Sequence, residues 1–261
     1  MMKEEKVSVS SKFWLCSADC LCGTLSGLIT GGGMTYFYTK YLGLDEGLAS
    51  IVWMIFAVWN ALNDPLFGYI SDRTKSKLGR RIPYIRYGAL LYGVIFILSW
   101  FLWPLGGSQT ALFVQMLVSL FFFDTFYTAI ATSLYVLPYT MAESNQARSG
   151  IFVWKIFFTL LSLAAPLVLF PLVRPDVGES ASRFQTIMIM LGVVTTLVIF
   201  FSTFFYKEKY TSDAEEAPGL WESICQCFKN RAFLVYEVIS FTVIFVQTIL
   251  MQGVVYYFDE L

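Results

Sequence analysis

The sequence predicts an all-α membrane protein, and two observations support that prediction. Of its 261 residues, 57% are hydrophobic, 18% aromatic and only 14% charged, which is more apolar side chain than a soluble domain of this length can bury. The apolar residues also form continuous runs of about 20, the length that crosses a bilayer as a helix. Because polar and apolar positions do not alternate along these runs, helices are favoured over a β-barrel.

Seven such runs follow one another, and each is expected to form one membrane-spanning helix. The second run has the least ambiguous pattern, whereas glycines in "LITGGGM" and three cysteines dilute the first. The predicted spans are residues 13–38, 47–70, 84–104, 110–138, 149–173, 186–206 and 232–258.

A long charged segment separates six of these helices from the seventh, and its Pro218 and Gly219 are typical of a linker. We therefore expect a six-helix bundle in residues 1–206, a cytosolic linker in 207–231, and helix 7 in 232–261. Within the linker, "GLWESICQCF" could form a short amphipathic helix on the membrane surface. A lone seventh helix lacks partners to pack against, so we expect it to begin an incomplete second bundle.

The distribution of positive charge predicts the orientation. Of 18 Lys and Arg residues, 14 fall on one side of the membrane if the amino terminus is cytoplasmic, three fall on the other side, and Lys155 lies within a span. The positive-inside rule then predicts a multi-pass protein of the cell membrane with a cytoplasmic amino terminus. The net charge of −1 gives no reason to expect a nucleic-acid partner.

Composition also argues against an enzyme and against a cofactor. The chain has no His, and it shows no nucleophile–base pair or metal-ligand cluster. Its five cysteines do not suggest a disulfide framework, because three lie in the first predicted span and two in the predicted cytosolic linker. Packing is the favoured role for these cysteines over metal binding.

Polar side chains interrupt the second predicted span. Asn60, Asn63 and Asp64 occur at positions i, i+3 and i+4, so they share one face of a helix. Asp64 precedes the charged Asp72 by eight residues, which places it about 12 Å inside the membrane. A buried carboxylate there costs several kcal/mol unless a cation, a partner or water compensates it. This face is expected to line a cavity.

Three further ionisable residues fall inside predicted spans: Asp19 and Lys155 about 9 and 10 Å deep, and Asp124 near the middle of the bilayer. Either Asp19 or Asp64 could pair with Lys155 and offset the cost of burial. Carboxylates with aromatic rings at mid-membrane suit sugar recognition, because carboxylates accept from hydroxyl pairs and rings stack on pyranose faces. Alternatively, each Asp could be a helix–helix clamp, and nearby hydroxyls such as Thr128 could bond to their own backbone.

The loop after the second span carries a spaced motif, "GxxxDRxxxxxGRR". Its members are Gly68, Asp72, Arg73, Gly79, Arg80 and Arg81. Ordinary positive-inside charge would explain basic residues here but not this spacing. The motif resembles the loop between helices two and three of the major facilitator superfamily. Together with "NDPLFG" before it and "YFYTKYLGL" after the first span, it resembles the glycoside-pentoside-hexuronide:cation symporters, typified by melibiose permease.

This resemblance covers essentially the whole chain, as helices one to seven of twelve. It implies an amino-terminal six-helix bundle of 3+3 inverted repeats and a missing carboxy-terminal six-helix bundle. It also implies secondary active transport of a sugar, glycoside, pentoside or uronide by alternating access. The implied partners are that small-molecule substrate and membrane lipid, the loop motif is implied to act in the conformational change, and the coupling ion is implied to be Na⁺ or H⁺.

The resemblance also implies individual site residues. Asn60, Asn63 and Asp64 match a "DxxND" cation-site pattern with Asn in place of its first Asp, and Tyr127 falls at an expected cation-site hydroxyl. The missing carboxylate argues against sodium coupling, and it leaves proton coupling through Asp64, weak coupling and facilitated diffusion open.

The expected substrate-binding residues are Asp19, Asp124, Thr128 and Lys155. Lys155 matches a basic residue of the family's helix five, and Asp19 matches an Asp of other members. The family's sugar-binding carboxylate of helix four would fall at Ile130, about two turns from Asp124.

Two alternative functions stay open: a non-transporting membrane interaction or regulatory half-transporter, and a lipid transporter of the same superfamily.

Overall fold

The computed structural model describes residues 5–103, 107–175, 180–209 and 220–259. It divides the chain into two compact units, Met1–Asp213 and Ala214–Leu261. The three-part division of the chain at residues 206 and 231 stays a prediction. In the first unit the helices are α1 (Val9–Thr30), α2 (Gly33–Tyr36), a π-helical turn (Phe37–Tyr41), α3 (Glu46–Arg73), α4 (Ile82–Leu98), α5 (Gln109–Met141), α6 (Asn145–Val173) and α7 (Ser182–Ser202).

The second unit contains two helices, α8 (Leu220–Lys229) and α9 (Arg231–Asp259). The short helix α8 coincides with the segment expected to be amphipathic, and α9 covers the seventh predicted span. The side chain of Asn230 accepts a hydrogen bond from the amide of Ala232 at 3.0 Å, so it caps the start of α9. Pro218 and Gly219 of the predicted linker lie outside the described residues.

Short polar side chains determine where several helices of the first unit begin. In each case a Ser or Asp oxygen accepts from the amide three residues later, which satisfies one of the orphan N–H groups of the first turn. Helix α4 instead has Pro83 in its first turn, where the missing N–H is no loss. The capping residues are Ser8, Asp45, Ser108 and Ser144.

Five helical segments are long and apolar enough to cross a membrane, judged over the described residues: Val9–Tyr41, Glu46–Arg73, Gln109–Met141, Asn145–Val173 and Ser182–Ser202. The apolar helix α4 is shorter, with 17 residues. The prediction that this span continues to residue 104 is wrong, because α4 ends at Leu98. The next residues turn back, and the fully buried Trp100 ring packs edge-on against Phe96 and Phe184.

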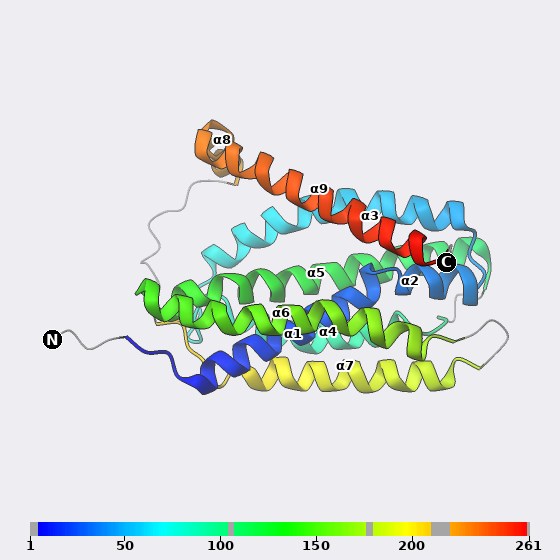
Figure 1. The fold of residues 1–261 in the computed structure, drawn as a ribbon, viewed down its shortest axis with the longest axis horizontal. Helices are drawn as coiled ribbons and strands as arrows, with labels where there is room; N and C mark the ends of the chain where they lie inside the picture. Colours follow the sequence, from blue (N-terminus) through cyan, green and yellow to red (C-terminus); the bar gives the residue numbers. More distant parts are fainter. Residues whose placement is uncertain (1–4, 104–106, 176–179, 210–219, 260–261) are drawn as a thin grey trace. The chain divides into compact units, whose positions relative to one another are not determined.

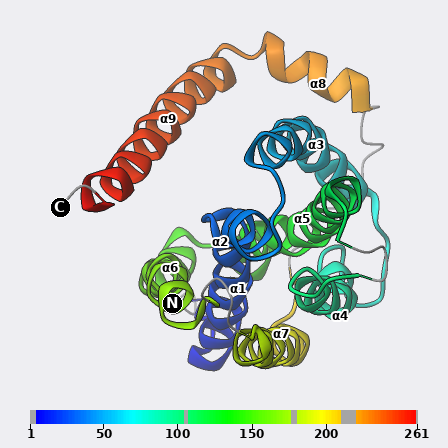
Figure 2. The same ribbon diagram turned by 90° about the vertical axis from the view of Figure 1, so that its right-hand side faces the viewer.

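The first unit is a bundle in which each helix packs on specific neighbours. Helix α1 packs on α6 and α7, α4 packs on α5 and α7, and α3 packs on α5. Figure 1 shows α5, α6 and α7 running lengthwise with α1 crossing at an angle, and Figure 2 views the bundle from one end. This arrangement confirms the prediction of an all-α bundle.

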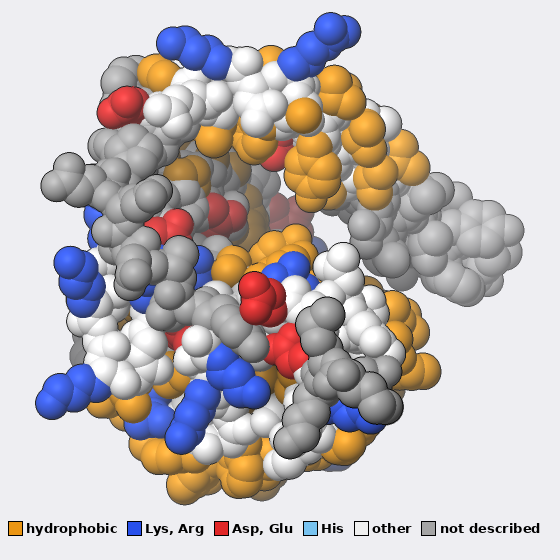
Figure 3. Space-filling model, turned by 90° about the vertical axis from the view of Figure 1, so that its left-hand side faces the viewer, with side chains coloured by type: hydrophobic (Ala, Val, Ile, Leu, Met, Phe, Trp, Pro, Cys, Tyr) orange, Lys and Arg blue, Asp and Glu red, His pale blue; other side chains and the backbone are white. Residues whose placement is uncertain are grey.

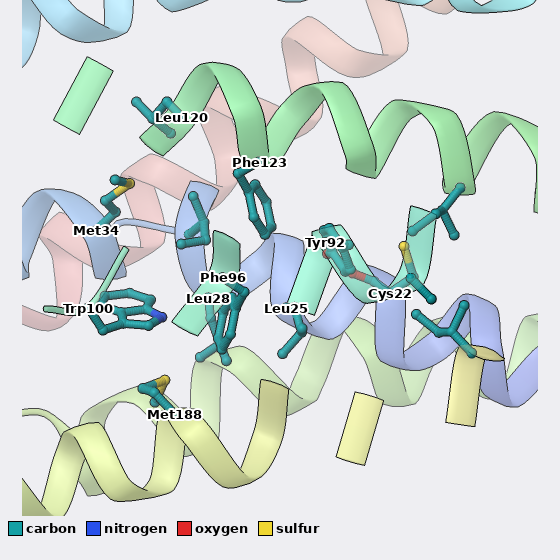
Figure 4. Packing of buried hydrophobic residues seen from close by; sticks show 14 of the residues in the cluster. Cys22, Leu25, Leu28, Met34, Tyr92, Phe96, Trp100, Leu120, Phe123 and Met188 are labelled. Carbon is teal, nitrogen blue, oxygen red and sulfur yellow. The ribbon is translucent and has the colours of Figure 1, made fainter. Parts of the chain in front are cut away.

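Aromatic and small residues fill the centre of the bundle. Figure 4 shows Tyr92 and Phe96 of α4 beside Phe123 of α5, with Cys22 of α1 close by. The Tyr92 hydroxyl donates to the backbone carbonyl of Cys22 at 2.7 Å, so the buried phenol is satisfied. Where α1 meets α6, a Cβ on Gly27 would lie only 2.6 Å from Pro166, and glycine therefore permits the close approach.

The outer surfaces of α3 and α6 are apolar, as contact with lipid requires. The exposed apolar residues include Met54, Val58 and Leu62 of α3, and Ile156, Phe157, Leu160 and Leu167 of α6.

Figure 3 looks onto the end at which α1 and α6 begin, where Lys and Arg side chains are numerous.

Candidate functional site

The polar face of α3 meets a buried carboxylate of α5. Asn60 and Asn63 donate through their side-chain nitrogens to the two carboxylate oxygens of Asp124, at 3.2 and 2.9 Å. Asn63 and Asp124 are only 1% and 4% exposed. Two amide donors thus compensate a carboxylate that would otherwise be costly inside an apolar bundle.

A second carboxylate lies in the same contact. Thr128, one turn beyond Asp124 on α5, donates its hydroxyl to Asp64 Oδ1 at 3.0 Å. The spacing of Asn60, Asn63 and Asp64 on α3, and of Asp124 and Thr128 on α5, puts all five on facing sides of two helices. We call these five residues the α3–α5 polar cluster.

The α3–α5 polar cluster has the chemistry of a cation or proton site. It combines two carboxylates with oxygen-bearing amides and a hydroxyl, and its carboxylates favour a positive charge nearby. An Asn that donates through its nitrogen keeps its carbonyl oxygen as an acceptor. Among the described residues, no three His, Cys, Asp or Glu side chains gather as metal ligands, so a metal ion here would need amide or hydroxyl oxygens as well.

A separate ion pair joins α1 to α6. Lys155 Nζ lies 3.2 Å from Asp19 Oδ2, and their side chains are 12% and 26% exposed. The Lys155 ammonium is also 5.8 Å from the centre of the Tyr135 ring, which belongs to α5. Of the two partners that the sequence offered for Lys155, the structure therefore selects Asp19.

The structure groups the predicted site residues differently from the sequence. Asp124 and Thr128, expected with the substrate, contact the residues expected to bind the cation. The Tyr127 ring stacks on Phe123 with ring centres 6.4 Å apart and lies 6.3 Å from the Tyr92 ring. The role of Tyr127 in a cation site stays a prediction.

Side-chain contacts join several residues of the loop motif between α3 and α4. Arg81 donates to Asp72 Oδ1 at 2.6 Å, and the Arg73 guanidinium lies over the Tyr69 ring, 4.0 Å from its centre. Gly79 has a positive φ of 108°, a conformation that side chains other than glycine's rarely adopt.

Sequence reasoning missed two polar residues that the structure makes prominent. Glu208 accepts hydrogen bonds from the backbone amides of Arg80, Arg81 and Ile82, more than 120 residues away in the chain. Gln115, fully buried in α5, donates to the hydroxyl of Tyr38 at 2.9 Å and bonds the backbone of the α4–α5 connection. A lone Gln in an apolar span was a usable signal, whereas Glu208 is one charge in a charged segment.

Comparison with known proteins identifies the family. The model of the family described as MFS/sugar transport protein matches residues 23–261. The chain belongs to this family. Its membership confirms the resemblance to the major facilitator superfamily, and the family is one of membrane transporters. The chain is accordingly a multi-pass membrane protein with the amino-terminal helical bundle of that superfamily.

Individual proteins show what the chain resembles. YagG of Escherichia coli (strain K12), provisionally named a glycoside/cation symporter, is 26% identical over 71% of this chain and 40% of its own length. The symporter YnaJ of Bacillus subtilis (strain 168) is 25% identical over 92% of this chain and 52% of its own length. The sodium-dependent lysophosphatidylcholine symporter 1 of Mus musculus is 28% identical over 61% of this chain and 30% of its own length. The chain therefore spans about half, or less, of the length of these relatives.

Proposed function

We propose that this chain is the amino-terminal half of a secondary active transporter that moves a sugar or glycoside together with a cation by alternating access. The observation that carries the proposal is the α3–α5 polar cluster, which brings a buried carboxylate, Asp124, and an exposed one, Asp64, together between two apolar helices of a transporter family. Such groups in a membrane protein mark ion or substrate pathways. No covalent step is needed, since transport requires only different affinities in the two orientations.

In this proposal the α3–α5 polar cluster holds the coupling ion. Asp64 is exposed on α3, so it is the carboxylate that an arriving Na⁺ or H⁺ would meet. One of its oxygens accepts a hydrogen bond from Thr128. Asp124 is buried and held by two amides. Its carboxyl group faces the helix that carries Asp64, and when ionised it would favour a cation at the cluster.

The Asp19–Lys155 pair is the proposed contact for the substrate. A carboxylate accepts from sugar hydroxyls and an ammonium donates to them, so the pair can exchange its internal contact for hydroxyl groups. The Tyr135 ring beside Lys155 adds an aromatic surface of the kind that stacks on a pyranose. The loop motif, with its Asp72–Arg81 ion pair, is proposed to act in the conformational change.

A lipid substrate is the second candidate, and one comparison favours it. A relative named for lysophosphatidylcholine matches 61% of the chain. A zwitterionic headgroup would bind the Asp19–Lys155 pair through opposite charges. The test of function therefore measures the uptake of sugars and, separately, of a lysophospholipid.

The test is uptake by the complete native protein reconstituted in vesicles, with an inward Na⁺ or H⁺ gradient and either a panel of sugars or lysophosphatidylcholine. We expect gradient-driven accumulation of a sugar in the wild type. Asp64→Asn should abolish accumulation of the substrate above its external concentration, while the substrate should still equilibrate across the membrane. Glu46→Gln, on the same helix but in an exposed pair with Lys40, is the matched control and should accumulate normally. Unchanged accumulation in Asp64→Asn would contradict the role of the cluster.

A further inference from the structure

The segment that leaves α7 carries a carboxylate into a cradle of backbone amides. Glu208 accepts from the amides of Arg80, Arg81 and Ile82 at 3.0, 2.8 and 3.1 Å. These amides open α4, where N–H groups lack intrahelical partners and the helix dipole favours negative charge. Charge-assisted bonds of this kind are about twice as strong as neutral ones.

The loop is shaped to admit this carboxylate. A Cβ at position 79 would lie 2.6 Å from both Cδ and Oε1 of Glu208. Gly79 is thus required twice, for its positive φ and for the space that Glu208 occupies.

The same segment is anchored on other helices. We call residues 203–209 the exit segment. The carbonyl of Phe205 accepts from Ser11 of α1 at 2.7 Å, and the Phe205 ring stacks on Trp14 with centres 4.6 Å apart. The amide of Lys209 donates to the carbonyl of Thr140 in α5 at 3.0 Å. The exit segment therefore ties the start of α1 and the ends of α5 and α7 to the start of α4.

Through Arg81, the Glu208 contact also reaches α3. The Arg81 amide binds Glu208, and its guanidinium binds Asp72 near the end of α3. The Arg81 side chain is 13% exposed, whereas Asp72 is 57% exposed, and an ion pair with a solvated partner contributes little by itself. Arg81 thus joins the Glu208 contact, through its backbone amide, to Asp72, through its side chain. Asp64 of the α3–α5 polar cluster lies on the same helix as Asp72.

We propose that Glu208 is a positioning residue of the transport cycle, which holds the α3–α4 loop and its Asp72–Arg81 pair against the exit segment while this end of the bundle is closed. The inference rests on the proposed transport function. Every turnover must reach the closed state and leave it again, so removal of the contact slows the cycle without touching the cation or the substrate.

The experiment combines amide exchange with transport in the complete protein. In Glu208→Ala, hydrogen–deuterium exchange of the peptide covering residues 79–82 should rise at least about tenfold, since three amides lose a charged acceptor. Maximal uptake should fall at least about fivefold, with equilibrium affinities for ion and substrate within about twofold of wild type. Glu208→Gln keeps the shape of the side chain but not its charge. Its amide exchange and its maximal uptake should lie between those of Glu208→Ala and the wild type. The neighbouring Lys207→Gln should behave as wild type.

Three outcomes would overturn the inference, and they are distinguishable. Unchanged exchange at residues 79–82 in Glu208→Ala would show that the carboxylate does not hold the loop. Raised exchange with an unchanged uptake rate, or with Glu208→Gln as fast as wild type, would show a structural contact without a role in the cycle. Absence of any uptake in the wild type would instead remove the proposed function on which the inference rests.

Discussion

At the scale of single residues, one carboxylate of α5 accepts hydrogen bonds from two side-chain amides of α3. Asp124 accepts from both Asn60 and Asn63. Substitutions that swap Asp124 with Asn60 therefore transfer one negative charge of the α3–α5 polar cluster from α5 to α3. Asp124→Asn alone should raise the cation concentration needed for half-maximal thermal stabilisation at least about tenfold, because a neighbouring charge contributes roughly 1–3 kcal/mol to a bound ion. Asn60→Asp alone should lower the melting temperature, since it sets two carboxylates side by side.

The double variant decides between charge and local packing. Asn60→Asp combined with Asp124→Asn restores one carboxylate and one amide in contact, and the cation response should return to within about threefold of wild type. Thermal unfolding of the complete protein over a series of Na⁺ concentrations and pH values measures this. Asn145→Asp, an exposed site in the first turn of α6, serves as the control for added charge. A double variant no better than Asp124→Asn would refute the shared role.

These residues show how far the sequence alone could go. The spacing of Asn60, Asn63 and Asp64 predicted a polar face, and the structure shows that face in contact with α5. That Asp124 would accept from the amides could not be predicted, because the rotation and depth of one helix against another depend on packing across the whole bundle. The sequence offered two partners for Lys155 for the same reason.

At the scale of helices, close packing of α1 on α6 depends on small residues. A Cβ on Gly27 would lie 2.6 Å from Pro166, whereas a Cβ on Gly68 of α3 would meet nothing within 4 Å. Gly27→Ala should therefore destabilise the protein by about 1–3 kcal/mol through overpacking. The matched Gly68→Ala should be neutral or stabilising by up to about 1 kcal/mol, as alanine favours a helix. Melting temperatures of both variants test this, and equal shifts would count against it.

Element boundaries were predictable only where local chemistry sets them. The capping serines and Asp45 mark helix starts that composition alone could place within a few residues. The end of α4 was mispredicted because Trp100 is as apolar as a lipid-facing residue, yet it turns inward onto Phe184. Hydropathy does not distinguish burial in protein from burial in lipid.

At the scale of the whole molecule, the chain spans about half of its relatives' length, and its charge asymmetry predicts how the bundle inserts. Fourteen of 18 Lys and Arg residues lie on one side of the predicted membrane, and short basic loops are retained in the cytosol. The loop between α3 and α4 should therefore be cytosolic, and the loop between α4 and α5 should face outward.

Impermeant thiol labelling of intact cells tests this orientation. In a Cys225→Ser/Cys227→Ser background, which removes the exposed cysteines among the described residues, Lys77→Cys should react only after the membrane is permeabilised. Gly107→Cys, whose Cβ would lie in open space, should react in intact cells. The background protein is the control, and the other cysteines among the described residues, Cys16, Cys20 and Cys22, are buried in α1. The reverse pattern would place Glu208 and the exit segment outside the cell, where the proposed contact would close the outer end of the transporter instead.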